Sequence, residues 1–201
     1  MKKVFALLLT AALLLALAAC GTKAPTNDSD ASVSEQPTEA VETVSDPLEL
    51  LETVWASYTE DEKFPSAGGD MTEENMRDGA PGVYGIADAS EVDRVLGYPA
   101  AEISKIDSAA SMVHMMNLNT FTAGAYHVVS GTDTAALASA IEKNIQSRQW
   151  MCGFPDKLIV VSAGSCLVSA FGAEDLVNTF RDKIVAAYAD AQVLVDAPID
   201  V

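Results

Sequence analysis

The residues that suggest chemistry by type and spacing lie in one short cluster, Met112-Val113-His114-Met115-Met116. Side chains alternate between the two faces of a β-strand, so on a strand Met112, His114 and Met116 would share one face. Two thioethers and an imidazole suit Cu(I), which prefers soft ligands. Methionines also fill irregular gaps in a core and form adaptable peptide-binding surfaces. We favour core packing and keep the copper site and the peptide surface as alternatives.

His114 and His127 are the only histidines, so a Ser-His-Asp or Cys-His arrangement would have to use one of them. Neither lies in a nucleophile motif, and the sequence contains no P-loop or zinc-protease motif. We predict a protein that is not an enzyme and needs no cofactor, with His127 hydrogen-bonded within a sheet. A small envelope enzyme stays an alternative that would require converging polar groups in a cleft around one histidine.

Cys152 and Cys166 would be able to form a disulfide in an oxidising compartment. The expected hairpin separates their starting positions by about one strand length, roughly 15–20 Å, whereas a bridge needs Cα atoms within about 7 Å. We therefore predict two buried free thiols. Trp150, Phe154 and Phe171 lie at the ends of expected elements, where aromatic side chains plug a core more often than they line a groove.

The beginning of the chain has the pattern of a bacterial lipoprotein signal. Two lysines precede Val4–Leu17, an uncharged run of about fourteen residues that is too short to span the roughly 30 Å hydrocarbon core comfortably. The run ends in the sequence LAAC, which resembles a lipobox, where the cysteine thiol accepts the diacylglycerol. We predict a signal peptide over residues 1–19, with Cys20 as the lipid-attachment site on the extracytoplasmic face of the cell membrane.

Residues 20–45 are rich in Ser, Thr, Pro and acidic residues and lack aromatic residues, which predicts a flexible tether. Loss of the two signal-peptide lysines changes the formal net charge from −17 to −19. Nucleic-acid binding needs basic residues, so this charge excludes it as a function. Contact between the domain surface and anionic lipid is disfavoured for the same reason. We expect residues 46–201 to form one domain.

Hydrophobic periodicity predicts the elements of this domain. In the first half we expect helices over 47–58 and 89–96, a loop over 59–82, a short strand over 83–86, and a strand rather than a helix over 108–118. In the second half we expect strands over 125–130, 158–163 and 166–171, and helices over 134–150 and 174–189. This order favours a two-layer α+β fold, with a mostly antiparallel sheet and amphipathic helices on one face. Residues 190–201 are expected to be a loosely held tail.

The lipobox, the acidic tether and the segments YHVVSG, FPDKLIVVSAG and LVSAFG occur in an order that resembles a family of bacterial lipoproteins known as a domain of unknown function. The resemblance covers roughly residues 80–190 and implies an extracytoplasmic lipoprotein, without catalytic residues to transfer. Cys166 stands where that family commonly has an aromatic residue. We expect a non-catalytic binding or scaffolding module for an envelope protein or a small ligand.

Overall fold

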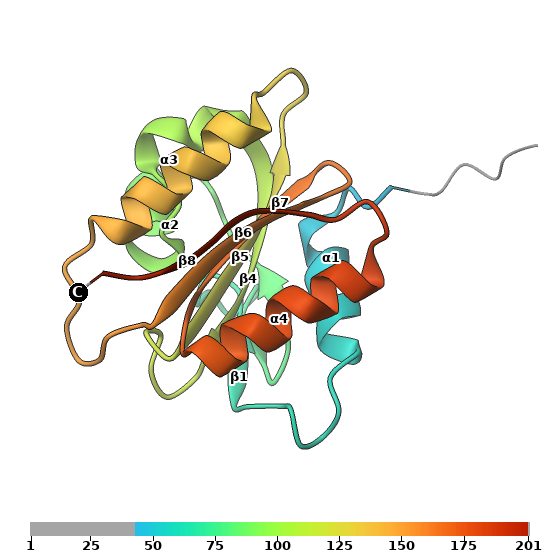
Figure 1. Cartoon of the computed structure of the whole chain (residues 1–201), viewed down its shortest axis with the longest axis vertical. Coiled ribbons are helices and arrows are strands. Elements are labelled where there is room, and N and C mark those ends of the chain that lie inside the picture. Colours follow the sequence, from blue (N-terminus) through green and yellow to red (C-terminus); the bar gives the residue numbers. More distant parts are fainter. Residues whose placement is uncertain (1–42, 201) are drawn as a thin grey trace, which may run out of the picture. The chain divides into compact units, whose positions relative to one another are not determined.

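The computed structural model describes residues 43–200 (Figure 1). The predicted signal peptide, the predicted lipid-attachment site Cys20 and most of the predicted tether lie outside the described residues. Within the described part, no helix has the length and apolar character needed to cross a membrane.

One antiparallel sheet organises the domain, with strand order β2-β1-β4-β5-β7-β6-β8 and with β3 also paired to β4. The strands are β1 (Ser66–Gly68), β2 (Arg77–Asp78), β3 (Gly82–Val83), β4 (Ile106–His114), β5 (Phe121–Val128), β6 (Lys157–Ala163), β7 (Cys166–Gly172) and β8 (Gln192–Pro198). The helices are α1 (Pro47–Ala56), α2 (Ala89–Leu96), the 3₁₀ helix η1 (Ala100–Lys105), α3 (Thr134–Gln146) and α4 (Glu174–Ala187). The predicted α+β class with a mostly antiparallel sheet is confirmed.

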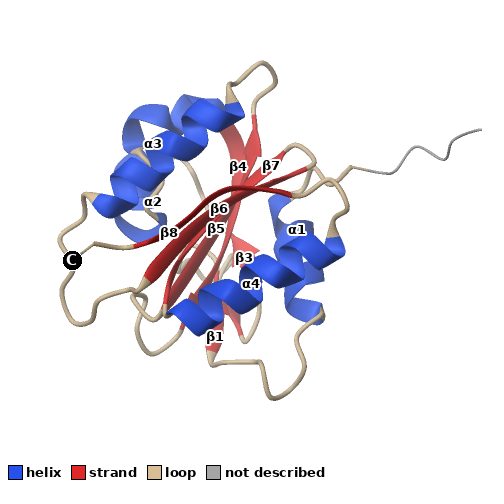
Figure 2. Cartoon of the chain, viewed as in Figure 1, coloured by secondary structure: helices blue, strands red, loops and turns tan. Residues whose placement is uncertain are grey.

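The helices divide between the two faces of this sheet, a detail that differs from the expected placement on one face (Figure 2). Ile159 and Val161 of β6 pack with α1 and α4, whereas the alternate residues Leu158 and Val160 pack with α2 and α3. A strand that is apolar on both faces needs cover on both. The division follows from the apolar run in β6.

Side-chain caps set the starts of α1, α2 and α3. Asp46 Oδ1 accepts a hydrogen bond from Leu48 N at 2.8 Å, and Asp88 and Asp133 cap α2 and α3 in the same way. Such caps satisfy backbone N–H groups that have no partner within the helix. The predicted starts of α1, α2 and α3 therefore match the observed ones. α4 also begins where predicted, but without a side-chain cap.

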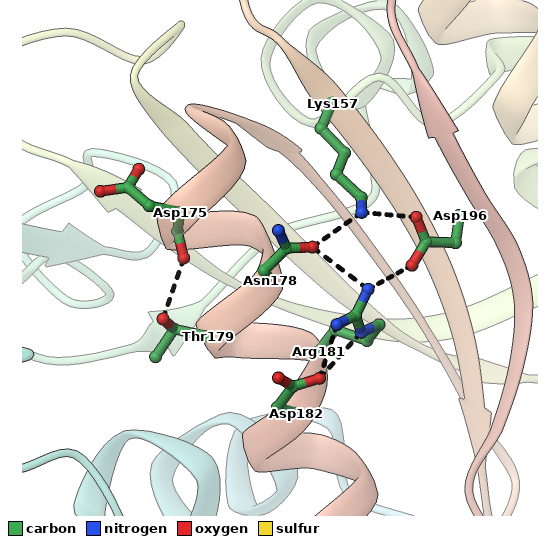
Figure 3. A network of polar contacts seen from close by, with 7 residues as sticks. All are labelled: Lys157, Asp175, Asn178, Thr179, Arg181, Asp182 and Asp196. Atoms are coloured by element: carbon green, nitrogen blue, oxygen red, sulfur yellow. Dashed lines mark hydrogen bonds and ion pairs between the residues drawn. The ribbon is translucent and has the colours of Figure 1, made fainter.

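The predicted loose tail over residues 190–201 is wrong, because β8 forms the edge of the sheet beside β6. Figure 3 shows the polar network that fixes this strand. Asp196 of β8 forms an ion pair with Lys157 Nζ of β6 at 2.6 Å and a second ion pair with Arg181 of α4. Asn178 Oδ1 of α4 accepts from the same Lys157 Nζ at 2.7 Å. The network joins two strands and a helix.

Several boundaries in the rest of the chain also differ from prediction. The strand expected over 108–118 ends at His114, the strand expected over 125–130 is β5 and begins at Phe121, and α3 ends four residues before the expected Trp150. The predicted strand over 83–86 is the two-residue β3. Val44, which falls within the predicted tether, is buried in the core beside α1.

The segment over 59–82, which we predicted to be a loop, contains the short strands β1 and β2. These strands form because two glycine backbones approach each other closely. A Cβ atom on Gly68 would lie 2.3 Å from the backbone nitrogen of Gly82, a separation that real Cβ atoms do not tolerate. Only glycine at this position lets the loop return across β1.

Candidate functional site

The pairing register defines two ends of the sheet. At one end β5 begins and β7 finishes, since Phe121 pairs with Gly172, and β4 finishes at His114. At the other end His127 pairs with Cys166, beside the β6–β7 turn. Strands of this length hold the two ends about 20–25 Å apart.

The first described residues lie at the end with the β6–β7 turn. Val44 O accepts a hydrogen bond from Ser165 N at 3.0 Å, and α1 begins shortly afterwards. We call this end, which holds Val44 and Ser165, the entry end. The chain that precedes the domain in sequence therefore joins it here.

The opposite end carries the exposed methionines, and we call it the methionine end. Of the methionines in residues 43–200, every one except Met112 is exposed, with Met116 at 78%. The exposed large side chains that define this end are Met71, Met76, Met115, Met116, Leu118, Met151 and Phe154. They come from three loops that are far apart in sequence.

A groove of about 400 Å³ lies within the methionine end. Its lining is mainly apolar and is formed by Ala67, Met71, Met76, Arg77, Asp78, Val113, Met115 and Leu118. We call this the methionine groove. Unbranched thioether side chains are flexible and polarisable, so such a lining adapts to apolar groups of different shape.

The loop that carries Met71 and Met76 is held by Asp70. Its carboxylate accepts hydrogen bonds from Thr72 Oγ1 at 2.7 Å, Asn75 Nδ2 at 2.9 Å and Gly85 N at 3.1 Å. Burial alone would raise the pKa of Asp70, but these hydrogen bonds outweigh it and lower the pKa. The exposed methionines thus stand on a loop with a defined shape.

The buried Ser111 hydroxyl connects this loop to the middle of the sheet. Ser111 Oγ of β4 accepts from Gly69 N at 2.9 Å and donates to Gly69 O at 3.3 Å. A buried hydroxyl with both roles satisfied stabilises the groups that it joins. The groove wall is therefore attached to β4.

The loop that carries Met151 is fixed by two asparagines that lie between β4 and β5. Asn117 Nδ2 donates to Cys152 O at 2.8 Å, and Asn119 Nδ2 donates to Met151 O at 2.8 Å and Gly153 O at 3.0 Å. These hydrogen bonds bring Met151 beside the turn that holds Met115 and Met116.

The structure separates the three residues of the candidate copper site. Met112 is fully buried in the core with α1 and α4. β4 ends at His114, so Met116 lies on the following turn and points into solvent. His114 stacks on Phe64 with ring centroids 5.6 Å apart, and its Nδ1 accepts from Met116 N at 3.3 Å. Met112 therefore belongs to the core, whereas Met116 belongs to the exposed surface.

His127 is hydrogen-bonded as predicted, since its Nδ1 lies 2.5 Å from Asp107 Oδ1. An open groove beside it includes Ser45 and Ser108, and Cys166 is its partner across the sheet. Among the described residues, however, His127 forms no hydrogen bond with any hydroxyl or thiol. A histidine activates a nucleophile through such a bond.

Both cysteines are free, as predicted, but only Cys166 is buried. Burial, with a smaller effect from the carboxylates of Asp46 and Asp107, raises the pKa of the Cys166 thiol to about 12. This thiol is therefore protonated at neutral pH and is a poor nucleophile. Cys152 is exposed in the loop of Met151, contrary to our expectation.

The predicted core positions of the three aromatic residues are confirmed for two of them. Phe171 is buried, and Trp150 packs on it with ring centroids 5.2 Å apart. Phe154 is 65% exposed at the methionine end. It belongs to the exposed surface and not to the core.

Acidic side chains dominate the rim of the methionine groove. Asp78 of β2 lines the groove, and Glu73 and Glu74 lie between the lining residues Met71 and Met76 on the loop that forms one wall. All three are exposed, and within residues 43–200 none of them forms an ion pair. Arg77 is the basic residue of this loop, and its Nη1 donates to Glu74 O at 2.6 Å and Met76 O at 2.9 Å. Its side chain folds onto the loop that carries it.

The comparisons with known proteins returned no match: neither family models, curated proteins nor solved structures resemble this chain. The resemblance to a lipoprotein family therefore stays a prediction. In the described part of the chain, no group of three or more His, Cys, Asp and Glu side chains is placed to hold a metal ion.

Proposed function

We propose that this protein is an extracytoplasmic lipoprotein, anchored through a lipid on Cys20, whose domain binds a polypeptide partner at the methionine groove. One observation carries the binding proposal. The exposed methionines gather at the end of the sheet that is remote from Val44, where the chain enters the domain. The groove therefore lies at the end of the sheet opposite the point where the chain enters the domain.

Folding alone does not explain these side chains. Exposed apolar residues scattered singly are ordinary, but a group of them that surrounds a groove is typical of an interaction surface. Proteins that accept several apolar partners use methionine-rich surfaces in this way. The hydrogen bonds of Asp70 and Asn119 hold the two methionine loops in place, which lowers the entropic cost of binding.

The alternatives have less support from the side-chain positions. A copper site would need Met112 and Met116 together, and they lie in the core and in solvent respectively. An enzyme based on His127 would need a nucleophile within hydrogen-bonding reach of its ring. Binding at the methionine groove, in contrast, requires no rearrangement of these side chains.

Site-specific photo-crosslinking in the native envelope tests the binding proposal. We would replace Met115, which lines the groove, with a photoreactive amino acid and, as the matched control, do the same at Val129, which is exposed near the entry end. We expect a discrete crosslinked product from position 115 and none from position 129. Equal products from both positions, or none from position 115, would contradict a partner at the methionine groove.

The anchor is tested separately with the substitution Cys20→Ser. We expect the unaltered protein to incorporate radiolabelled palmitate and to fractionate with membranes. The variant should lose the label and be released. Labelling of the serine variant would show that Cys20 is not the attachment site.

A further inference from the structure

We propose that the partner segment presents apolar side chains flanked by basic residues, so that its apolar groups enter the methionine groove and its cations meet the acidic rim. This inference rests on the proposed function. It assigns the chemical class of the partner to a surface that we have so far described only by its apolar lining.

The charges around the groove are unbalanced. Glu73, Glu74 and Asp78 have no cationic partner among the described residues. Within residues 43–200, Arg77 is the one cation that lines the groove, and its single positive charge, whose guanidinium donates to backbone carbonyls of its own loop, offsets only one of the three carboxylates. Asp70 adds a fourth carboxylate at the base of this loop, where it accepts hydrogen bonds from Thr72, Asn75 and Gly85. A cationic segment would find complementary charge at the rim, which accelerates encounter and selects the partner.

The size of the groove indicates what its apolar part can hold. At about 400 Å³, it lies near the lower limit of the range of about 300–1,000 Å³ that binds whole small molecules. It is open to solvent and not an enclosed cavity. Such a groove accommodates a few side chains of an extended or helical segment that continues beyond it.

Other occupants conflict with the charge. A second copy of this chain would bring another acidic rim, and the full sequence already carries 29 acidic residues against 12 basic ones. The chain segment that precedes Val44 enters the domain at the opposite end and is itself rich in acidic residues. A bilayer with anionic head groups would be repelled by the same carboxylates.

Titration with designed peptides tests the inference. The protein is the chain from residue 20 onward with Cys20→Ser, and the probe is a fluorescent peptide of alternating lysine and leucine. Alternating glutamate–leucine and lysine–serine peptides are the controls. We expect saturable binding of the lysine–leucine peptide that weakens as salt is added, with either control at least about tenfold weaker, since each loses one of the two contributions.

Two pairs of substitutions separate the contributions. Met76→Ser with Met115→Ser should weaken the lysine–leucine peptide about tenfold or more, because exposed side chains that become buried on binding are removed. Glu73→Gln with Glu74→Gln should weaken it about two- to tenfold at low salt and reduce the salt dependence. The matched controls are Val185→Ser, an exposed apolar position on α4, and Glu49→Gln with Glu52→Gln on α1. Neither control should change the affinity.

The outcomes distinguish this inference from the proposed function. If the methionine variant weakens binding but the glutamate variant does not, and the glutamate–leucine peptide binds equally well, the groove is a binding site and the charge inference is wrong. If the methionine variant binds the lysine–leucine peptide as the unaltered protein does, the groove is not the site and both proposals fail. Absence of any binding of the lysine–leucine peptide overturns the charge inference, and the crosslinking experiment then decides on the groove alone.

Discussion

The two ends of the sheet differ in the side chains that they expose. At the entry end, Val44 covers the β6–β7 turn, and the neighbouring pocket includes the hydroxyl-bearing residues Ser130, Thr132 and Ser165. At the methionine end, flexible apolar side chains stand in solvent around an acidic rim. Both ends belong to the same strands and share the same core. Within the described residues, the exposed methionines are therefore confined to the loops of one end, and the stability of the fold does not require them.

The largest expected effect is a difference in stability between alanine variants of Met112 and Met116, two methionines that were predicted to share one strand face. Met112→Ala removes a fully buried side chain and should lower the free energy of unfolding by about 2–5 kcal/mol. Met116→Ala removes an exposed one and should change it by less than about 0.5 kcal/mol. Urea denaturation of both variants measures the difference. Equal losses would show that Met116 belongs to the core after all.

A second comparison concerns the glycines that shape the two ends. Gly68→Ala would place a methyl group against the backbone of Gly82 and should destabilise the protein by about 1–3 kcal/mol or more. Gly131, near the entry end, has φ of +86° and open space around it, so Gly131→Ala should cost about 1 kcal/mol from the backbone conformation alone. Thermal denaturation compares the two variants. A milder effect at Gly68 than at Gly131 would contradict the close packing of the methionine loop.

The ion pairs of β8 predict a pH dependence of stability. Burial would raise the pKa of Asp196, but hydrogen bonds from Lys157 and Arg181 outweigh it and lower the pKa. A lowered pKa in the folded state contributes stability that is present above the unfolded value, about 3.9, and is lost as the pH falls through the folded value. Asp196→Asn should cost about 1 kcal/mol at neutral pH, and the difference from the unaltered protein should shrink below about pH 4. Urea denaturation of both proteins across this pH range measures the difference in their free energies of unfolding. A difference that stays constant below about pH 4 would contradict the role of the Asp196 ion pairs.

The smallest perturbation uses the two thiols as reporters. Cys152 lies exposed at the methionine end, whereas Cys166 is buried near the entry end with a raised pKa. A thiol reagent should label Cys152 rapidly in the folded protein and Cys166 only after unfolding. Cys152→Ser should abolish the rapid phase. Rapid labelling that persists in this variant would mean that the entry end is open.

Local patterns predicted the part of the fold that depends on local chemistry. β6 and β7 were recognisable from their apolar runs and the turn between them. α3 and α4 were recognisable from apolar residues spaced at helical intervals, with acidic residues in the first turn of α4. β8 was missed because pairing with β6 and the ion pairs of Asp196 fix it from distant parts of the chain. β1 and β2 were missed because they are short and depend on the close approach of Gly68 and Gly82.

The methionine groove was only partly visible in the sequence. The cluster at 112–116 lies partly on β4, which contributes to the groove. Strand alternation predicted Met112 and Met116 on one face, but β4 ends at His114, so the alternation does not extend to Met116. Met71 and Met151 lie in separate loops, and no periodicity links them. Their convergence depends on the asparagine and aspartate hydrogen bonds that hold those loops, which only the folded chain reveals.

The central claim is that the methionine end binds a polypeptide, and NMR of methyl-labelled methionines in the presence of the lysine–leucine peptide tests it most directly. We predict that the methyl resonances of Met71, Met76 and Met115 shift in a saturable way while that of the buried Met112 does not. A peptide that binds without moving any of these three methyl resonances would place the contact elsewhere and contradict the account.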